Sequence, residues 1–296
     1  MRRMLIGLVL VGMTMAAEWT PLWETEAPGA PKPAEGTEKV GDRAAYTDIG
    51  QPQYFLHSAE GKATGQGVVI FPGGGYTVAM MDHEGHEFGQ WLAGRGITAM
   101  VVKYRVSGRD ELGYHFPVPY LDARRAIRTM RAHAEEWGID PGKIGVMGFS
   151  AGGHLASLCA TKFDEAFDQE TKDKIDQLSC RPDFAVLVYP VISMGDITHQ
   201  GSRRRLAGPD PSKELLEALS TERQVSEKAP PCFLLTTSDD MVDCRNSLRF
   251  AEACKAHGVP VALHMFEQGG HGYGLHGNGN LAVWPELLEA WLKARR

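Results

Sequence analysis

The sequence lacks several features that would assign it to other functional classes. Its formal net charge is −6, and its longest basic run is Arg203-Arg204-Arg205. Proteins that bind nucleic acid or anionic membranes carry basic patches, so we expect neither partner. The chain also has no internal repeat and no C-x-x-C pair. The absence of that pair argues against a cysteine zinc site.

Cysteine is scarce, and the five cysteines are odd in number, so at least one thiol is unpaired within a monomer. Cys159 and Cys232 lie in apolar stretches and are expected in the core, because free cysteine behaves as a small hydrophobe. Cys244 and Cys254 could meet across a loop and a helix. The sequence leaves their pairing open.

No apolar run is long enough for an ordinary membrane span. The run Met4–Met13 follows Met1-Arg2-Arg3 and precedes the small residues Ala16-Ala17. This pattern predicts a cleaved secretory signal over 1–17 and a secreted or periplasmic protein. A buried N-terminal strand or an uncleaved anchor is the alternative. Residues 18–44, rich in Pro, Gly and Glu, are expected to form an extended arm before a domain over 45–296.

Within that domain, strand-like and helix-like segments alternate. Near-continuous apolar strands separated by helices predict one doubly wound α/β domain with a mostly parallel sheet and helices on both faces. Ligands in such sheets bind beyond the carboxyl ends of the strands. The polar stretch 193–227 interrupts the alternation and is a candidate lid. The expected strands are 67–71, 97–106, 144–147, 184–191, 232–236 and 259–266; the expected helices are 84–93, 119–137, 246–256 and 282–293.

One short motif indicates the chemistry. Gly148-Phe149-Ser150-Ala151-Gly152 follows an apolar strand and precedes a helix-like segment. This is the pattern of a nucleophile elbow, a strained strand-to-helix turn that exposes a serine hydroxyl. A glycine-rich turn with an incidental serine is the alternative. The choice depends on whether a base and an acid follow in the right order.

Both partners follow Ser150 along the chain. Serine is a weak nucleophile and needs a base that is oriented by a third group. His271, flanked by glycines just past an expected strand, is the candidate base, although a histidine in a solvated loop would look similar. Asp239 and Asp240 close the preceding strand. We prefer Asp239 as the acid, because it is the first carboxylate past the strand and lies three residues before a valine, and interpret Asp240 as a turn residue.

Acyl transfer also needs donors for the oxyanion. The loop Pro72-Gly73-Gly74-Gly75-Tyr76 directly follows the first expected strand. Its glycines let the backbone approach developing charge, so we expect the N–H groups of Gly74, Gly75 and Ala151 to form an oxyanion hole. A phosphate-binding loop is the competing interpretation, but neither G-x-G-x-x-G nor a P-loop lysine is present. A plain hairpin turn is the third.

Two other clusters receive a lesser weight. His83 and His86 flank Glu84 but lack the spacing of H-E-x-x-H, so a solvated or pocket-lining face is preferred over zinc. Lys103-Tyr104-Arg105 ends a strand on the expected substrate side. Arg105 is expected to pair with Asp122. We expect Tyr76, Glu84 and Tyr104 to contribute to substrate binding.

These motifs together resemble one group of enzymes, the α/β-hydrolase esterases of the acetylxylan-esterase and bacterial feruloyl-esterase-like type. The resemblance covers about residues 45–295. It implies a cofactor-independent serine esterase that removes acyl groups, most often acetyl, from carbohydrates, with Ser150, Asp239 and His271 as the triad. One departure is visible, because the family usually has proline after Val242 and this chain has Asp243. The motifs that carry the resemblance lie at 73–76, 84–85, 103–105, 136–141, 148–156, 246–247 and 270–272, together with the helix that contains Asp122.

Two other functional classes share parts of this pattern. A serine peptidase related to prolyl oligopeptidase shares this type of catalytic domain, but usually carries a large extra domain for which this chain has no room. A non-catalytic binding module on a hydrolase fold would need a broken triad. The sequence leaves the acyl group, the sugar and the oligomeric state open.

Overall fold

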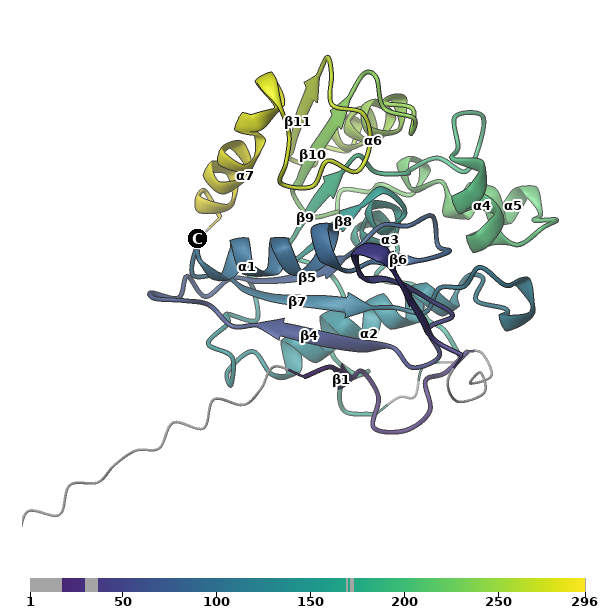
Figure 1. Cartoon of the computed structure of the whole chain (residues 1–296), viewed down its shortest axis with the longest axis horizontal. Helices are drawn as coiled ribbons and strands as arrows, with labels where there is room; N and C mark the ends of the chain where they lie inside the picture. Colours follow the sequence, from purple (N-terminus) through teal and green to yellow (C-terminus); the bar gives the residue numbers. More distant parts are fainter. Residues whose placement is uncertain (1–17, 30–36, 169, 171–172, 296) are drawn as a thin grey trace, which may run out of the picture.

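A mostly parallel eight-stranded sheet forms the centre of the computed structural model, which describes residues 18–29, 37–168, 170 and 173–295 (Figure 1). The strand order is β1-β4-β7-β5-β8-β9-β10-β11. Six consecutive members of this order pair in parallel. They are β7 (Thr98–Lys103), β5 (Gly67–Phe71), β8 (Ile144–Phe149), β9 (Phe184–Val188), β10 (Cys232–Thr237) and β11 (Val261–Phe266).

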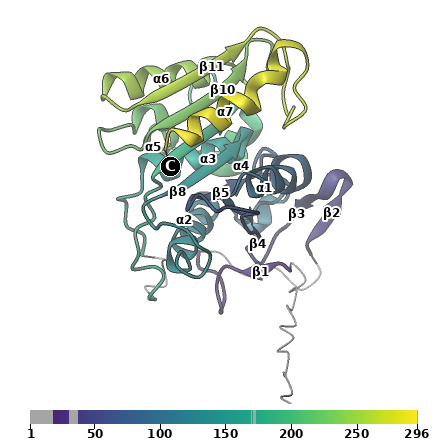
Figure 2. The same ribbon diagram turned by 90° about the vertical axis from the view of Figure 1, so that its left-hand side faces the viewer.

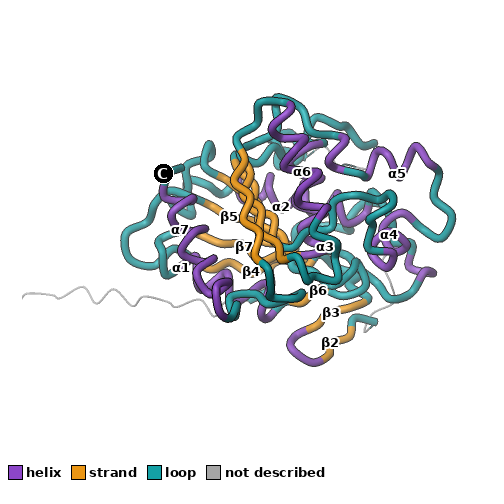
Figure 3. Tube along the Cα trace, turned by 90° about the horizontal axis from the view of Figure 1, so that it is seen from above, coloured by secondary structure: helices purple, strands orange, loops and turns teal. Residues whose placement is uncertain are grey.

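The five inner parallel strands are buried along their whole length. Continuous apolar runs of this kind are required when helices cover both faces of a sheet. Figure 3 shows α1 (Glu87–Ala93) and α7 (Trp284–Lys293) on one side of the strands. On the other side lie α2 (Val118–Ala132), α3 (Ser150–Thr161) and α6 (Arg245–Ala256). The predicted fold class is therefore confirmed.

The opposite edge of the sheet is antiparallel, which the sequence did not indicate. β4 (Gln53–His57) runs antiparallel to β7, and β1 (Thr20–Pro21) pairs with β4. The residues after β1, Leu22 and Trp23, are buried in the core. Part of the expected arm over 18–44 is thus built into the fold.

A second, three-stranded sheet consists of β2 (Lys39–Gly41), β3 (Ala45–Thr47) and β6 (Ala79–Met80). Figure 2 shows β2 and β3 side by side at the margin of the molecule, where they pair antiparallel. The chain between β6 and α1 makes a π-helical turn, Asp82–His86. Short 3₁₀ turns at 42–44, 110–112, 221–223 and 279–283 complete the described elements.

The segment between β9 and β10 includes the polar stretch 193–227. It contains α4 (Gln200–Ala207) and α5 (Lys213–Leu219). In Figure 1 both helices lie on the side toward which β7 points, at the carboxyl ends of the parallel strands. The insertion therefore lies at the edge of the sheet where α/β proteins bind ligands.

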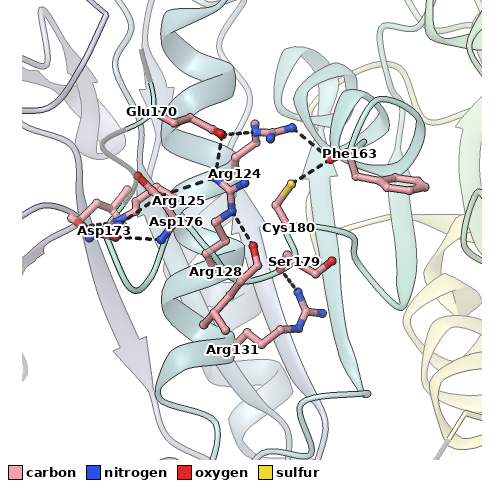
Figure 4. Close-up of polar contacts among 12 residues, drawn as sticks. Arg124, Arg125, Arg128, Arg131, Phe163, Glu170, Asp173, Asp176, Ser179 and Cys180 are labelled. Atoms are coloured by element: carbon pink, nitrogen blue, oxygen red, sulfur yellow. Dashed lines mark hydrogen bonds and ion pairs between the residues drawn. The ribbon is translucent and has the colours of Figure 1, made fainter. Parts of the chain in front are cut away.

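Arginines of α2 hold the connection between α3 and β9 (Figure 4). Arg124 and Arg128 both donate to Glu170, each at 2.7 Å. Arg125 donates to Asp173 at 2.7 Å. These guanidinium groups are largely buried, so removing a carboxylate partner would leave a poorly solvated charge unpaired and should loosen this connection from the helix.

The expected pair between Arg105 and Asp122 is confirmed. Nη2 of Arg105 lies 2.6 Å from Oδ1 of Asp122, and the backbone N–H of Arg105 donates to Oδ2 at 2.8 Å. Both side chains are buried. This pair joins the end of β7 to α2.

The five cysteines are free thiols, so Cys244 and Cys254 are not bridged. Cys159 and Cys232 are buried, as expected for core residues. The signal expected at 1–17 lies outside the described residues. Within the part of the chain that is described, no helix is both long and apolar enough to cross a membrane.

Candidate active site

Ser150 lies at a sharp turn between β8 and α3. β8 ends at Phe149 and α3 begins at Ser150, whose φ is +53°. Few non-glycine residues adopt this left-handed conformation, and a nucleophile elbow imposes it. The helix passes so close to β5 that a Cβ on Gly152 would collide with the carbonyl oxygen of Phe71. The geometry is that of the expected elbow.

His271 reaches Ser150 from the loop after β11. Its Nε2 lies 2.9 Å from Oγ of Ser150, although the two residues are 121 positions apart in the chain. Its flanking glycines, Gly270 and Gly272, have φ of +65° and +74°. The loop can therefore turn tightly and bring the imidazole back over the nucleophile.

The acid beside His271 is Asp240, which corrects the expectation of Asp239. Oδ1 of Asp240 lies 2.8 Å from Nδ1 of His271, and the Asp240 side chain is completely buried. A carboxylate can only accept at this contact, so Nδ1 carries the imidazole proton and Nε2 is left to accept from the serine hydroxyl. This arrangement of three groups can activate a serine for nucleophilic attack.

Asp239 contacts the same loop in another way. Its carboxylate accepts the backbone N–H groups of Gly269 at 3.1 Å and Gly270 at 2.9 Å. These two N–H groups lower the pKa of Asp239 below its ordinary value. The two carboxylates thus contact different parts of the loop: Asp239 holds the backbone before His271, and Asp240 meets the imidazole.

The glycine loop after β5 lies beside Ser150. Gly74 and Gly75 have φ of +130° and +66°. Among the described residues, the backbone N–H groups of these two glycines have no hydrogen-bond acceptor. The N–H of Ala151 lies in the first turn of α3, where helices leave N–H groups without an internal partner. All three expected donors are thus available to an external oxygen.

The three residues expected to bind substrate are all buried, and we correct that expectation. Tyr76, Glu84 and Tyr104 are 2%, 3% and 0% exposed. Tyr104 donates its hydroxyl to the Pro72 carbonyl at 2.6 Å, and Glu84 accepts the Gly73 N–H at 2.8 Å. The Tyr76 hydroxyl contacts His154 in α3 at 2.8 Å. These side chains hold the glycine loop from behind, and none offers a surface to a ligand.

The structure brings one further histidine to the site. His199, in the insertion, accepts the N–H of Ser202 at its Nδ1, so its proton is on Nε2. Burial lowers its pKa, and nearby His271 lowers it further. A Cβ on Gly75 would lie 3.9 Å from Cε1 of His199. Nothing in the polar sequence around His199 distinguishes it from a solvated histidine.

The two histidines around Glu84 have different neighbours: Nε2 of His83 lies 3.9 Å from Oε1 of Glu84, whereas His86 contacts His57. Nδ1 of His86 lies 3.1 Å from Nε2 of His57, and burial lowers the pKa of both imidazoles. Glu84 instead faces the glycine loop. Within the described ranges, no three His, Cys, Asp or Glu side chains converge as a metal site would require.

Comparison with known proteins gives consistent matches. The BD-FAE family model matches residues 55–254. The endo-1,4-beta-xylanase B of Butyrivibrio fibrisolvens is 34% identical over 256 residues, which are 85% of this chain and 39% of that protein. The acetylxylan esterase of Xylanibacter ruminicola is 32% identical over 234 residues, 77% of this chain and 45% of that protein. The chain thus spans less than half the length of either relative.

A solved structure matches over almost the whole chain. The acetyl ester-xyloside bifunctional hydrolase of Caldicellulosiruptor lactoaceticus has a TM-score of 0.80 and 40% identity, over 96% of this chain and 98% of that one. The structural match agrees with the mostly parallel sheet and its covering helices. The resemblance expected from the motifs is confirmed: the chain belongs to the BD-FAE family and has the α/β-hydrolase fold.

Proposed function

We propose that this protein is a serine carboxylic-ester hydrolase that removes acyl groups, most of all acetyl, from carbohydrates. One observation carries the catalytic part of the proposal. His271 lies between Ser150 and Asp240, at 2.9 Å from the hydroxyl and 2.8 Å from the carboxylate. The imidazole is therefore already within hydrogen-bond reach of both the hydroxyl and the carboxylate.

The proposed reaction has two stages. His271 takes the proton of Ser150 as Oγ attacks the ester carbonyl, and the carbonyl oxygen becomes an oxyanion. The N–H groups of Gly74, Gly75 and Ala151 stabilise that charge. His271 then returns the proton to the leaving alcohol, and an acyl-enzyme remains on Ser150.

Water completes the turnover. His271 takes a proton from water, which attacks the acyl carbonyl, and the proton returns to Ser150 Oγ as the acid leaves. In both stages Asp240 keeps the proton of the neutral imidazole on Nδ1 and stabilises the imidazolium. No cofactor takes part in this scheme.

The carbohydrate part of the proposal is supported by the relatives. Their names describe an acetylxylan esterase, a xylanase and an acetyl ester-xyloside hydrolase. Polymeric esters lie outside the cell, and we propose that residues 1–17 direct secretion or export to the periplasm. N-terminal sequencing of the exported protein tests this, and a mature chain that retains the basic residues Arg2 and Arg3 contradicts it.

A substrate panel tests the function. p-Nitrophenyl acetate, acetylated xylan, acetylated monosaccharides, methyl ferulate and a chromogenic peptide should be compared for wild type and S150A. We expect release of acetate from the sugar esters by wild type and none above background with S150A, whose fold is checked by circular dichroism. Near-wild-type turnover by S150A would overturn the serine mechanism. Peptide cleavage without ester cleavage would overturn the proposed esterase function.

A further inference from the structure

We propose that Glu84 is a positioning residue. Through Tyr189 it links the glycine loop after β5, which carries the oxyanion donors, to the base His271. The proposal rests on the function proposed above. Glu84 lies in the π-helical turn Asp82–His86, and its side chain is 4% exposed. A buried carboxylate outside the triad requires an explanation, because removing the charge from water is unfavourable unless hydrogen bonds replace the solvent.

The first contact of Glu84 is with the glycine loop. Oε2 accepts the N–H of Gly73 at 2.8 Å. Gly73 lies so close to the nucleophile that an added Cβ would be 3.0 Å from Cβ of Ser150. By holding this peptide, Glu84 sets the position of the next two residues, Gly74 and Gly75, whose N–H groups remain free for the oxyanion.

The second contact is with a tyrosine that packs against the base, His271. Oε1 of Glu84 accepts the hydroxyl of Tyr189 at 2.7 Å. Burial raises the pKa of Tyr189, and the Glu84 carboxylate raises it further, so the hydroxyl stays protonated and donates. The Tyr189 ring lies against the imidazole of His271, with ring centroids 4.8 Å apart.

Tyr189 itself is held under strain. It directly follows β9 with φ of +36°, which is rare for a residue with a side chain, and it is buried. Its hydroxyl also accepts the N–H of Gly274, three residues after His271, at 3.4 Å. Strained, fully enclosed residues of this kind are found where the surrounding structure must hold a functional geometry.

A carboxylate suits this position because it only accepts. Its two oxygens receive an N–H and an O–H at the same time, and both bonds are strengthened by the negative charge. Among the described residues, no lysine or arginine lies within ion-pair distance of Glu84, and only His83 approaches it, at 3.9 Å. The geometry therefore points to the two hydrogen bonds as the reason for the carboxylate.

The substitution Glu84→Gln tests the proposal. Gln can accept from Gly73 but then presents its NH₂ to the Tyr189 hydroxyl, which reverses that hydrogen bond. We expect kcat for p-nitrophenyl acetate to fall about tenfold to hundredfold, less than the loss of a whole oxyanion donor, with KM changed less than about threefold. Tyr189→Phe removes one hydroxyl and should lower kcat in the same way but less.

Two further measurements separate positioning from a general effect on stability. A trifluoromethyl ketone forms a tetrahedral adduct whose oxyanion occupies the same site, so its affinity should fall with kcat/KM in both variants. The double variant should lose less than the product of the two single losses, because both act through one link. Asp48→Asn, at a buried carboxylate that contacts Ser107 and Arg109, is the matched control and should keep wild-type kcat.

The outcomes are distinguishable. An E84Q variant that folds and keeps wild-type kcat and inhibitor affinity overturns the coupling role while wild-type esterase activity stands. Multiplicative effects of E84Q and Y189F also overturn it. If E84Q does not fold, Y189F alone decides, because loss of one hydroxyl leaves the packing intact. Absence of esterase activity in wild type would instead contradict the proposed function.

Discussion

Asp240 and His271 face each other across 2.8 Å, and the side chain of Asp240 is fully buried at that contact. The neighbouring Asp239 has its carboxylate on two backbone N–H groups of the histidine loop. Two adjacent acids thus serve one histidine in different ways. Asp240 orients the ring, and Asp239 shapes the loop that carries it.

Because the two aspartates make different contacts, replacing each one by asparagine should lower kcat to a different extent. Asp240→Asn would leave the imidazole in the wrong tautomer, and kcat should fall by about 10⁴, the loss known for the corresponding change in a serine protease. Asp239→Asn keeps a side-chain acceptor for Gly269 or Gly270 and should lose less than about tenfold. Steady-state kinetics with p-nitrophenyl acetate decides, and a larger loss for D239N would reverse the assignment.

The glycine loop gives a second prediction. Gly74 has φ of +130°, and a Cβ there would collide with the backbone of Val78. Gly74→Ala should therefore displace an oxyanion donor and lower kcat by about 10² or more. Gly258→Ala is the control, since Gly258 has φ of +70° with open space around it, and should affect stability by about 1 kcal/mol without changing kcat. Equal kcat for the two variants would contradict the role of the loop.

His154 predicts how stability depends on pH. Burial lowers its pKa to about 4 from 6.5, while it bonds the Tyr76 hydroxyl and the Leu219 carbonyl. As pH falls below about 6.5, His154 binds a proton in the unfolded chain but stays neutral in the folded protein. The free energy of unfolding should therefore decrease by on the order of 3 kcal/mol between pH 6.5 and 4 from this group.

The variant His154→Gln isolates this effect. Gln can donate to Leu219 and accept from Tyr76, but it does not titrate. Urea unfolding at several pH values should give a shallower loss of stability for H154Q than for wild type over that range. Parallel curves for the two proteins would show that His154 does not make this contribution.

The buried pair of Arg105 and Asp122 predicts a large stability effect. Asp122→Ala leaves a buried guanidinium without its carboxylate and should lower the free energy of unfolding by about 3–5 kcal/mol. Glu217→Ala removes an exposed partner of Arg223 and should change it by less than about 1 kcal/mol. Urea denaturation midpoints of the two variants check this, and similar shifts would contradict it.

Local patterns predicted the parts of the site that depend on backbone shape. The elbow at Ser150 was recognisable because a strand-to-helix turn needs glycines at fixed spacing. His271 was recognisable because glycines flank it just past a strand. Parallel strands were recognisable because burial on both faces requires continuous apolar runs. The short antiparallel strands β1 and β4 have no such run, so only their pairing at the sheet edge defines them.

Side-chain direction could not be predicted in this way. Tyrosine and glutamate are common in binding sites. Nothing in the sequence shows that Tyr76, Glu84 and Tyr104 all lie behind the glycine loop. His199 lies 49 residues beyond Ser150 in a polar insertion, and only the folding of that insertion brings it near His271. Burial depends on contacts between distant segments, which residue type alone does not report.

The fold class, the family and the proposed nucleophile and base, Ser150 and His271, could be predicted from local turn geometry and from the alternation of strands and helices. The tertiary structure decided which aspartate meets His271 and why Glu84 is buried. Asp239 and Asp240 differ by one position, so their roles depend on where the histidine loop packs against β10. That packing brings together residues about thirty positions apart, and no local pattern encodes it.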